Sequence, residues 1–219
     1  MDYQLRTHPR AKKITLRLDK NGQPIVTVPH FTPKILVNKF VAKNQGWIDK
    51  HRQQLTAGKD KFNSDKQLMI FGRSYQKEIT IDSNQPSKVL IGKNKVLINL
   101  HSDNTDQNQV VEKFLKNTAI HYLTTKTNQL AKKMKVKFSK LSFRAQTTRW
   151  GSCSSKGALS FNWKLVHFPP EVIDYVIIHE LAHLEHLNHS ADFWQLVAKF
   201  CPEHKLHQGW LKRQGIGVH

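Results

Sequence analysis

Two histidines four residues apart, His179 and His183, enclose a glutamate in the segment His-Glu-Leu-Ala-His. On an α-helix, residues four apart lie about 40° from each other around the axis, so both imidazoles share one face and can bind one ion. Glu180 lies about 100° from His179, where its carboxylate is outside the ligand pair but can reach a water molecule beside the ion. The spacing is that of the HExxH zinc hydrolase motif, and it predicts a metal site with Glu180 as general base.

A third ligand has two candidates, His186 and His189. His186 would share the face of the first two histidines if the helix continued, but three ligands on one straight helix are spread over about 10 Å of rise, which fits poorly around a single ion. His189 follows Asn188, which tolerates the left-handed conformation that ends helices, and Ser190 with Asp192 can start another helix. This geometry favours His189 and leaves His186 as the alternative.

The motif must lie on a helix with one face in the core. Apolar residues at helical spacing predict that face opposite the histidines, at Ile173, Ile177, Leu181 and Leu184. The helix is predicted to start at Pro169-Pro170-Glu171, because proline is tolerated in a first turn and an acid suits the positive end of the helix dipole.

Upstream of this helix, alternating apolar residues predict several strands. We expect them at 134–138, where Lys135 and Lys137 would form a basic outer face, and at 140–144, 149–153 and 158–163. A long helix is predicted over 110–134, preceded by a polar linker at 102–109. We therefore expect a catalytic domain over 108–219.

Residues 1–107 are predicted to be a β-rich, basic N-terminal region, although one continuous domain remains an alternative. A hairpin is expected at 14–18 and 25–28 around Asn21-Gly22. A helix is expected from Thr32-Pro33 to about Leu55, followed by a polar stretch over 57–66. Further strands are predicted around 68–70, 76–81 and 88–100.

The composition limits the class of protein. The chain has 219 residues, and 35 Lys and Arg against 16 Asp and Glu give a net charge of +19, with most of the excess in residues 1–100. A polyanion such as nucleic acid is a candidate partner of the basic half, and a solvated lysine-rich surface is the alternative. No apolar run approaches the roughly 18 residues of a membrane span or the core of a signal peptide, which predicts a cytoplasmic protein without a membrane partner.

The two cysteines, Cys153 and Cys201, are too few for a disulfide framework or a cysteine zinc site, so we expect reduced thiols. Cys153 as a nucleophile is a weak alternative, because no neighbouring residue is marked as its base.

A set of segments in fixed order carries a family resemblance. These are Arg149-Trp150-Gly151-Ser152-Cys153-Ser154, Gly157-Ala158-Leu159, Asn162-Trp163-Leu165, Pro169, Asp174-Tyr175-Val176, the HExxH motif, and Asn188-His189-Ser190-Phe193-Trp194. They resemble the YgjP-like metallopeptidase family, as does the opening hairpin with its basic run. The resemblance implies a zincin-like α+β fold related to SprT-like and WLM proteases, in which the HExxH helix packs on a small sheet. By position, it implies His179, His183 and His189 as Zn²⁺ ligands and Glu180 as base.

Peptide hydrolysis also needs a donor for the oxyanion, and Arg149, Arg144 and Tyr175 are candidates that the sequence does not rank. The strand around Trp150 could bind an extended peptide by β-augmentation, or Trp150 could be a core aromatic. No organic cofactor is predicted.

Three functions follow from these residues. The first is a zinc peptidase cleaving peptides or proteins, including proteins associated with nucleic acid. The second is a metal-dependent hydrolase of nucleotide phosphoanhydrides, against which stands the lack of a Gly-rich phosphate loop. The third is a nucleic-acid-binding protein with structural zinc, in which His186 would complete a closed site.

Overall fold

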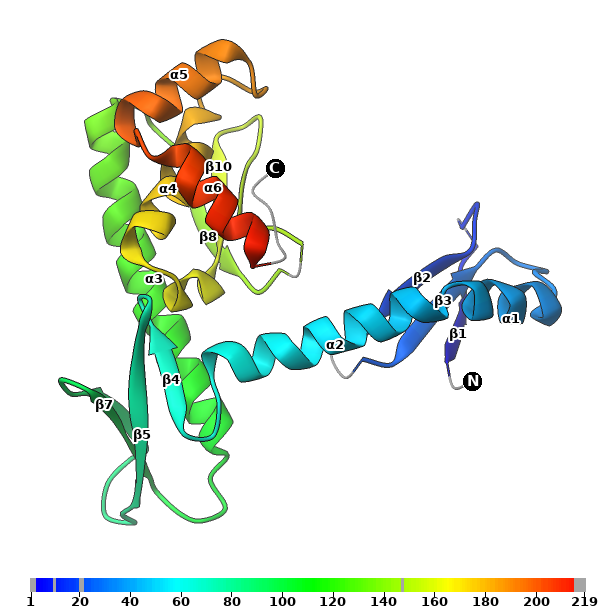
Figure 1. Ribbon diagram of the computed structural model, residues 1–219, viewed down its shortest axis with the longest axis horizontal. Helices are drawn as coiled ribbons and strands as arrows, with labels where there is room; N and C mark the ends of the chain where they lie inside the picture. The colour runs from blue at the N-terminus through cyan, green and yellow to red at the C-terminus, as the bar shows by residue number, and fades with distance from the viewer. Residues whose placement is uncertain (1–2, 10, 20–21, 147, 215–219) are drawn as a thin grey trace. The chain divides into compact units, whose positions relative to one another are not determined.

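The computed structural model describes residues 3–9, 11–19, 22–146 and 148–214, with side chains for all of these except 53–61. The chain is a mixed α+β protein whose described part contains three small sheets and six α-helices (Figure 1). It divides into two compact units, Met1–Ser64 and Asp65–His219. The division predicted near residue 107 falls inside the second unit, at the start of helix α3 (Gln107–Met134).

The first unit begins with a three-stranded sheet. Strands β2 (Thr15–Leu18) and β3 (Pro24–Val28) form the predicted antiparallel hairpin, while β1 (Gln4–Thr7) pairs with β3 in parallel. Gly22 has a φ of +80°, which suits a turn that only glycine adopts without strain, whereas Asn21 lies outside the described residues. The hairpin is confirmed, and the parallel partner is an addition that local patterning does not predict.

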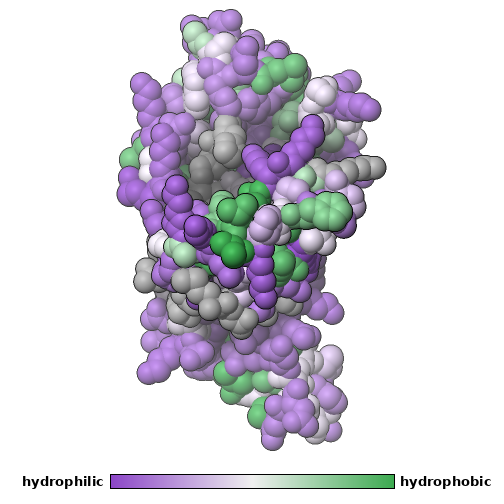
Figure 2. All heavy atoms as spheres, turned by 90° about the vertical axis from the view of Figure 1, so that its right-hand side faces the viewer, coloured by the Kyte–Doolittle hydropathy of each residue, from purple (hydrophilic) through white to green (hydrophobic). Residues whose placement is uncertain are grey.

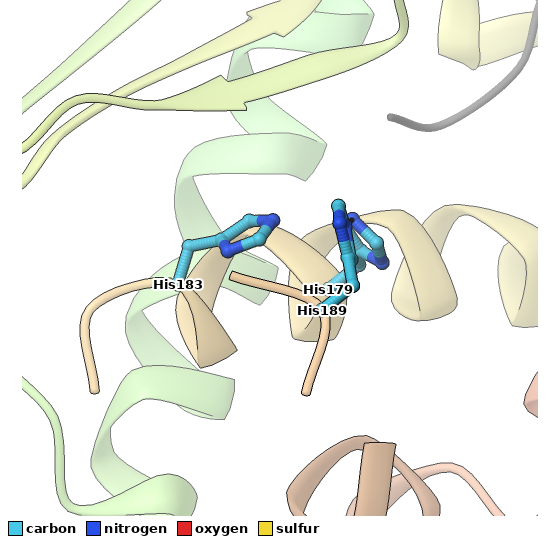
Figure 3. Close-up of side chains that lie close together, drawn as sticks. All are labelled: His179, His183 and His189. Atoms are coloured by element: carbon cyan, nitrogen blue, oxygen red, sulfur yellow. Dashed lines mark hydrogen bonds between the residues drawn. The ribbon is translucent and has the colours of Figure 1, made fainter. Parts of the chain in front are cut away.

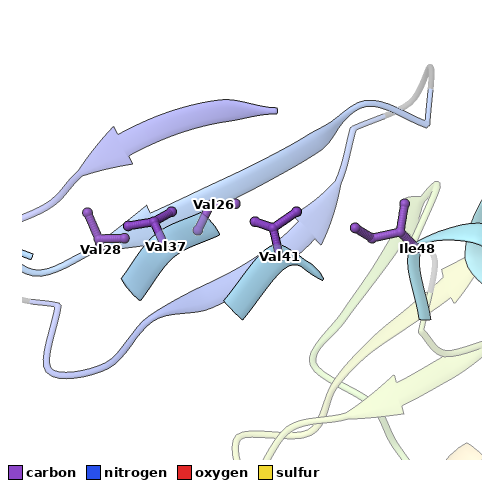
Figure 4. Close-up of a cluster of buried hydrophobic side chains, with 5 residues drawn as sticks. All are labelled: Val26, Val28, Val37, Val41 and Ile48. Atoms are coloured by element: carbon purple, nitrogen blue, oxygen red, sulfur yellow. The ribbon is translucent and has the colours of Figure 1, made fainter. Parts of the chain in front are cut away.

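Valines hold this sheet against the helices that follow. Val26 and Val28 of β3 meet Val37 and Val41 of helix α1 (Lys34–Lys43), with Ile48 of the next helix beside them (Figure 4). All five side chains are almost completely buried, so this cluster is the core of the first unit.

The helix predicted to reach about Leu55 is two helices. Helix α1 (Lys34–Lys43) ends at Asn44, whose side-chain amide donates to the carbonyl of Phe40 at 2.7 Å, and α2 (Gln45–Phe62) begins directly after it. The prediction of a single helix is wrong, because an asparagine that bonds its own backbone competes with continued helix formation. Helix α2 also extends through most of the polar stretch that was expected to be irregular.

The second unit starts with a four-stranded sheet in the order β4-β5-β7-β6. Its strands are β4 (Gln67–Ile70), β5 (Arg73–Ile81), β6 (Lys88–Ile91) and β7 (Lys95–Leu100). The apolar segment predicted over 88–100 is therefore an antiparallel pair, β6 and β7, and β5 runs parallel to β7. Alternate residues of β7 are buried on the side of α3, which packs against this sheet.

Helix α3 starts within the polar run that was predicted to be a linker. The Asp106 carboxylate accepts hydrogen bonds from the amides of Asn108 and Gln109, which satisfies donors of the first turn. At its other end Lys135 is left-handed, with a φ of 61°, and the amide of Val136 donates to the carbonyl of Ala131 at 3.0 Å. The strand predicted over 134–138 is wrong, because Met134 is the last residue of α3, Lys135 is its cap, and residues 136–138 form neither helix nor strand.

The third sheet lies next to the HExxH helix. Its order is β8-β10-β9, with β10 (Ala158–Asn162) parallel to β8 (Lys140–Arg144) and antiparallel to β9 (Gly151–Cys153). These are the strands predicted from the sequence, shortened at some ends. A 3₁₀ helix, η1 (Trp163–His167), follows β10 and is capped by the side chain of Asn162.

Three helices complete the unit: α4 (Pro170–Ala182), α5 (Ala191–Phe200) and α6 (His204–Arg213). Helix α4 starts with the predicted proline and Glu171 in its first turn, and it contacts α3, α5, α6 and β9. Helix α6 has no counterpart among the elements predicted from the sequence. Among the described residues, no helix is long and apolar enough to cross a membrane.

The turn between β4 and β5 fixes the four-stranded sheet to η1, directly before α4. The amides of Phe71 and Gly72 donate to the carbonyls of Val166 and His167, at 2.7 and 3.2 Å. In return Nδ1 of His167 donates to the carbonyl of Met69 at 2.7 Å. Burial lowers the pKa of His167 to about 4, so its imidazole is neutral in the folded protein at neutral pH.

This histidine should make stability depend on pH. Its folded pKa lies below the value of about 6.5 expected when unfolded, so the unfolded chain binds a proton that the folded chain does not as pH falls from 6.5 to 4. We expect this residue to lower the free energy of unfolding by up to about 3 kcal/mol over that range. Urea unfolding between pH 4 and 7 should show a shallower decline for His167→Gln than for wild type, and identical declines would contradict the assignment.

Candidate metal centre

His179 and His183 lie at the carboxyl end of α4, with His179 buried inside the last turn and His183 at the residue that caps the helix. The helix therefore ends earlier than its apolar spacing predicted. The chain reverses through a tight turn, in which the amide of His186 donates to the carbonyl of Ala182 at 3.0 Å. Asn188 is not among the residues with positive φ, so the left-handed ending expected there is wrong.

His189 lies between α4 and α5 and returns to the two helix histidines. Its Nε2 is 3.1 Å from Nε2 of His179, and ligand nitrogens of all three residues lie within 4.8 Å of one another (Figure 3). Nitrogen ligands around a tetrahedral zinc ion, with bonds near 2 Å, are separated by about 3.3 Å. The three imidazoles therefore fit one ion of this kind.

His186, the alternative third ligand, is not part of this group. It contacts the centre through its main chain, because its carbonyl oxygen lies 3.0 Å from Nδ1 of His183. This hydrogen bond assigns the proton of His183 to Nδ1 and leaves Nε2 available for an ion, which is the usual second contact of a metal-bound histidine.

Helix α5 packs against the three histidines through Phe193. The Ser190 hydroxyl accepts from the amide of Phe193, as the predicted cap, and Asp192 lies in the first turn. The fully buried Phe193 ring lies 5.0, 4.6 and 4.8 Å from the rings of His179, His183 and His189. The sequence pattern gave Phe193 no role, and only the tertiary structure reveals it.

Glu180 is 3% exposed and lies against Gly151 of β9. A Cβ atom at position 151 would come within 2.6 Å of both Cγ and Oε1 of Glu180, so the carboxyl group occupies the space that a larger residue would fill. Burial raises the pKa of Glu180 to about 8, and the positive charge of Arg149 opposes the rise. A carboxyl group that exchanges its proton near neutral pH is suited to acid–base chemistry.

The other candidate residues differ in position. Arg149 and Arg144 are both exposed, and the positive charge of Arg149 acts on the Glu180 carboxyl group. Trp150 is buried and packs edge-on against Phe168 at 4.5 Å, as expected of a core aromatic. Tyr175 is fully buried, and its hydroxyl has no hydrogen-bond partner among the described residues.

Cys153 faces the same side of β9 as Gly151, because residues two apart in a strand point the same way. Burial, together with the charge of Glu180, raises the pKa of its thiol to about 11. The thiol is protonated at neutral pH, which disfavours the alternative of a cysteine nucleophile.

An α+β fold that brings three histidines together beside a buried glutamate defines a metal-binding hydrolase. The sequence model of the YgjP-like metallopeptidase domain matches residues 12–214. The chain therefore belongs to the YgjP-like metallopeptidase family, as the resemblance predicted. No match was found among curated proteins.

Two crystal structures of metallopeptidase zymogens are similar to part of the chain. Abylysin of Pyrococcus abyssi is 20% identical with a TM-score of 0.41, covering 44% of this chain and 99% of its own. Jannalysin of Methanocaldococcus jannaschii is 22% identical with a TM-score of 0.36, covering 42% of this chain and 95% of its own.

The contact between Gly151 and Glu180 can be tested by adding one methyl group. We expect Gly151→Ala to lower the free energy of unfolding by about 1–3 kcal/mol, because the methyl group overpacks a buried site. Gly46→Ala is the matched control: it lies in α2 with nothing within 4 Å of the new atom and should stabilise by up to about 1 kcal/mol. Denaturant unfolding of both variants checks this, and a neutral Gly151→Ala would disprove the tight contact.

Proposed function

We propose that the protein is a cytoplasmic zinc peptidase, in which His179, His183 and His189 hold the metal and Glu180 is the general base. The convergence of three imidazole nitrogens beside a buried carboxyl group carries this proposal. Family membership supports peptides or proteins as substrates. Both cysteines are free, which suits a reducing compartment.

Three histidine ligands with an open fourth position are typical of catalytic zinc, whereas structural zinc has four protein ligands. Among the described residues, the group contains three. This supports a catalytic site over the alternative of a nucleic-acid-binding protein with structural zinc. When bound, the ion supplies Lewis-acid chemistry, polarising a carbonyl group and lowering the pKa of water toward about 7.

Glu180 would accept the proton of the attacking water and deliver it to the nitrogen of the leaving amine. Its burial removes competing bulk water from the proton transfer, and Gly151 provides the room for its side chain. Among the donors predicted for the oxyanion, Arg149 is favoured, because its charge acts at Glu180 while Tyr175 is enclosed in the core.

Strand β9 would bind the substrate, since it is an edge strand that pairs with β10 on one side. An extended peptide added to a sheet edge forms main-chain hydrogen bonds without a strict sequence requirement. Because Gly151 of β9 lies against Glu180, a peptide on this edge would lie beside the proposed base.

The roles of Glu180 and the histidines are separable. We expect Glu180→Gln to keep its metal and lose at least about 100-fold in casein hydrolysis, because it cannot accept the proton. His183→Ala should lose the metal itself. Metal content and initial rates check both, and full activity of Glu180→Gln would rule out the proposed base. Phosphate or pyrophosphate release from nucleoside triphosphates by wild type, without casein cleavage, would favour the phosphoanhydride alternative.

We also propose that the first unit binds nucleic acid, and so directs the peptidase to proteins associated with it. The register pairs Thr7 with Val28 and Thr15 with Thr27, so the segments after β1, before β2 and after β3 share one end of the sheet. Exposed side chains gather at that end: Lys12, Lys13, His30, Phe31 and Lys34. Hydrophilic side chains also cover most of the face drawn in Figure 2.

Phe31 is the unusual member of this group. Its side chain is 98% exposed and its φ is +66°, a region that bulky residues rarely occupy and that is often associated with function. An exposed aromatic ring among lysines is the arrangement on which single-stranded nucleic acids stack.

Binding should therefore depend on both salt and the ring. We expect affinity for a fluorescent single-stranded oligonucleotide to fall steeply with added salt, and Phe31→Ala to weaken it about tenfold through lost stacking. Phe31→Trp, which keeps an aromatic face, is the matched control and should bind at least as well as wild type. Fluorescence anisotropy measures both, and no binding at low salt would end this proposal.

A further inference from the structure

Two columns of packed rings connect α6 to the candidate metal centre. In the first, His204 of α6 stacks on Trp194, and Trp194 stacks on His189, both with centroids 5.7 Å apart and planes 25° apart. In the second, His207 packs on Tyr175 at 6.2 Å, and Tyr175 packs on His179 at 6.0 Å. Helix α6 thus reaches two of the three histidines through one aromatic residue each.

The first column is fixed at its outer end. His204 is buried, and its Nδ1 lies 3.2 Å from the carbonyl oxygen of Cys201, in the turn that precedes α6. This hydrogen bond restrains the plane of the imidazole. Trp194 lies half-buried on α5, where its indole stacks with both the His204 ring and the His189 ring.

His189, at the inner end of the first column, needs a contact that fixes the plane of its ring. A metal-bound histidine is normally oriented by a hydrogen bond from its second nitrogen, as His183 is through the carbonyl of His186. Among the described residues, Nδ1 of His189 has no such partner, and His189 is exposed in a segment without helix or strand. Ring packing is therefore what sets its plane, with Phe193 edge-on at 4.8 Å and Trp194 stacked at 5.7 Å.

We propose that Trp194 and His204 are positioning residues that orient His189 for metal binding, so that α6 is part of the metal site without touching it. This inference rests on the proposed ligand role of His189. A positioning role differs from ordinary core packing in one respect: removing either ring should alter the metal environment as well as the stability of the fold.

The experiment uses the full chain loaded with Co²⁺, whose visible absorption reports ligand geometry. We expect Trp194→Leu to raise the Co²⁺ dissociation constant about tenfold and to change the absorption bands, because the residue that orients a metal ligand is lost. His204→Leu should change the dissociation constant and the absorption bands in the same direction but by less, because His204 acts through Trp194. Trp194→Phe, which keeps a ring, should restore much of the affinity.

Leu211→Ala is the matched control, since Leu211 is a fully buried residue of α6 outside both columns. It should lower the thermal unfolding midpoint while leaving Co²⁺ affinity and spectrum unchanged. If a leucine variant does not fold, His204→Asn tests the same step, because asparagine lacks the ring but can still donate to the Cys201 carbonyl.

A wrong ligand set and a wrong positioning role would give different results. If His189→Ala binds Co²⁺ as wild type does, the proposed ligand set is wrong. If His189→Ala loses affinity while folded Trp194 and His204 variants keep wild-type affinity and spectrum, the ligand set stands and the positioning role is overturned.

Discussion

The burial of α4 on all sides is the constraint to which the rest of the second unit conforms. From Val172 to Ala182 every residue is buried except Asp174, which forms a partly buried ion pair with Lys126 of α3 at 3.1 Å. A helix enclosed in this way normally carries only apolar residues, yet α4 also carries His179 and Glu180. Placing an imidazole and a carboxyl group in the interior costs free energy, so the neighbouring elements must satisfy or accommodate each of them.

Glu180 shows how that accommodation fixes the sheet. Its side chain needs space within van der Waals distance of β9, which is available because position 151 has no side chain. Glycine within a strand often marks such a close approach. The same enclosure that raises the pKa of Glu180 to about 8 also excludes bulk water from it, so the packing of β9 on α4 and the acid–base character of the carboxyl group have one physical cause.

The sequence predicted features that depend on neighbouring residues and missed those that depend on distant ones. The shared face of His179 and His183, the proline start of α4 and the hairpin of β2 and β3 all follow from local spacing, and they are present. The parallel pairings of β5 with β7 and β8 with β10 join distant segments, which periodicity cannot match. Likewise, the sequence does not rank Arg149, Arg144 and Tyr175 as oxyanion donors, and only tertiary burial separates Tyr175 from the two arginines.

His189 lies beside the two helix histidines for a different local reason from the one predicted. Asn188 does not end α4, because the chain already reverses after Ala182. His189 returns to the helix histidines because the next helix starts directly after it. Ser190 caps α5. Phe193, three residues further on, is buried against the three imidazoles. A capped helix start fixes the direction of the residue just before it, since the cap residue has an extended backbone and the first turn is rigid. The position of His189 is thus a consequence of where α5 begins. His189 directly precedes the cap Ser190, whereas His186 lies earlier in the turn.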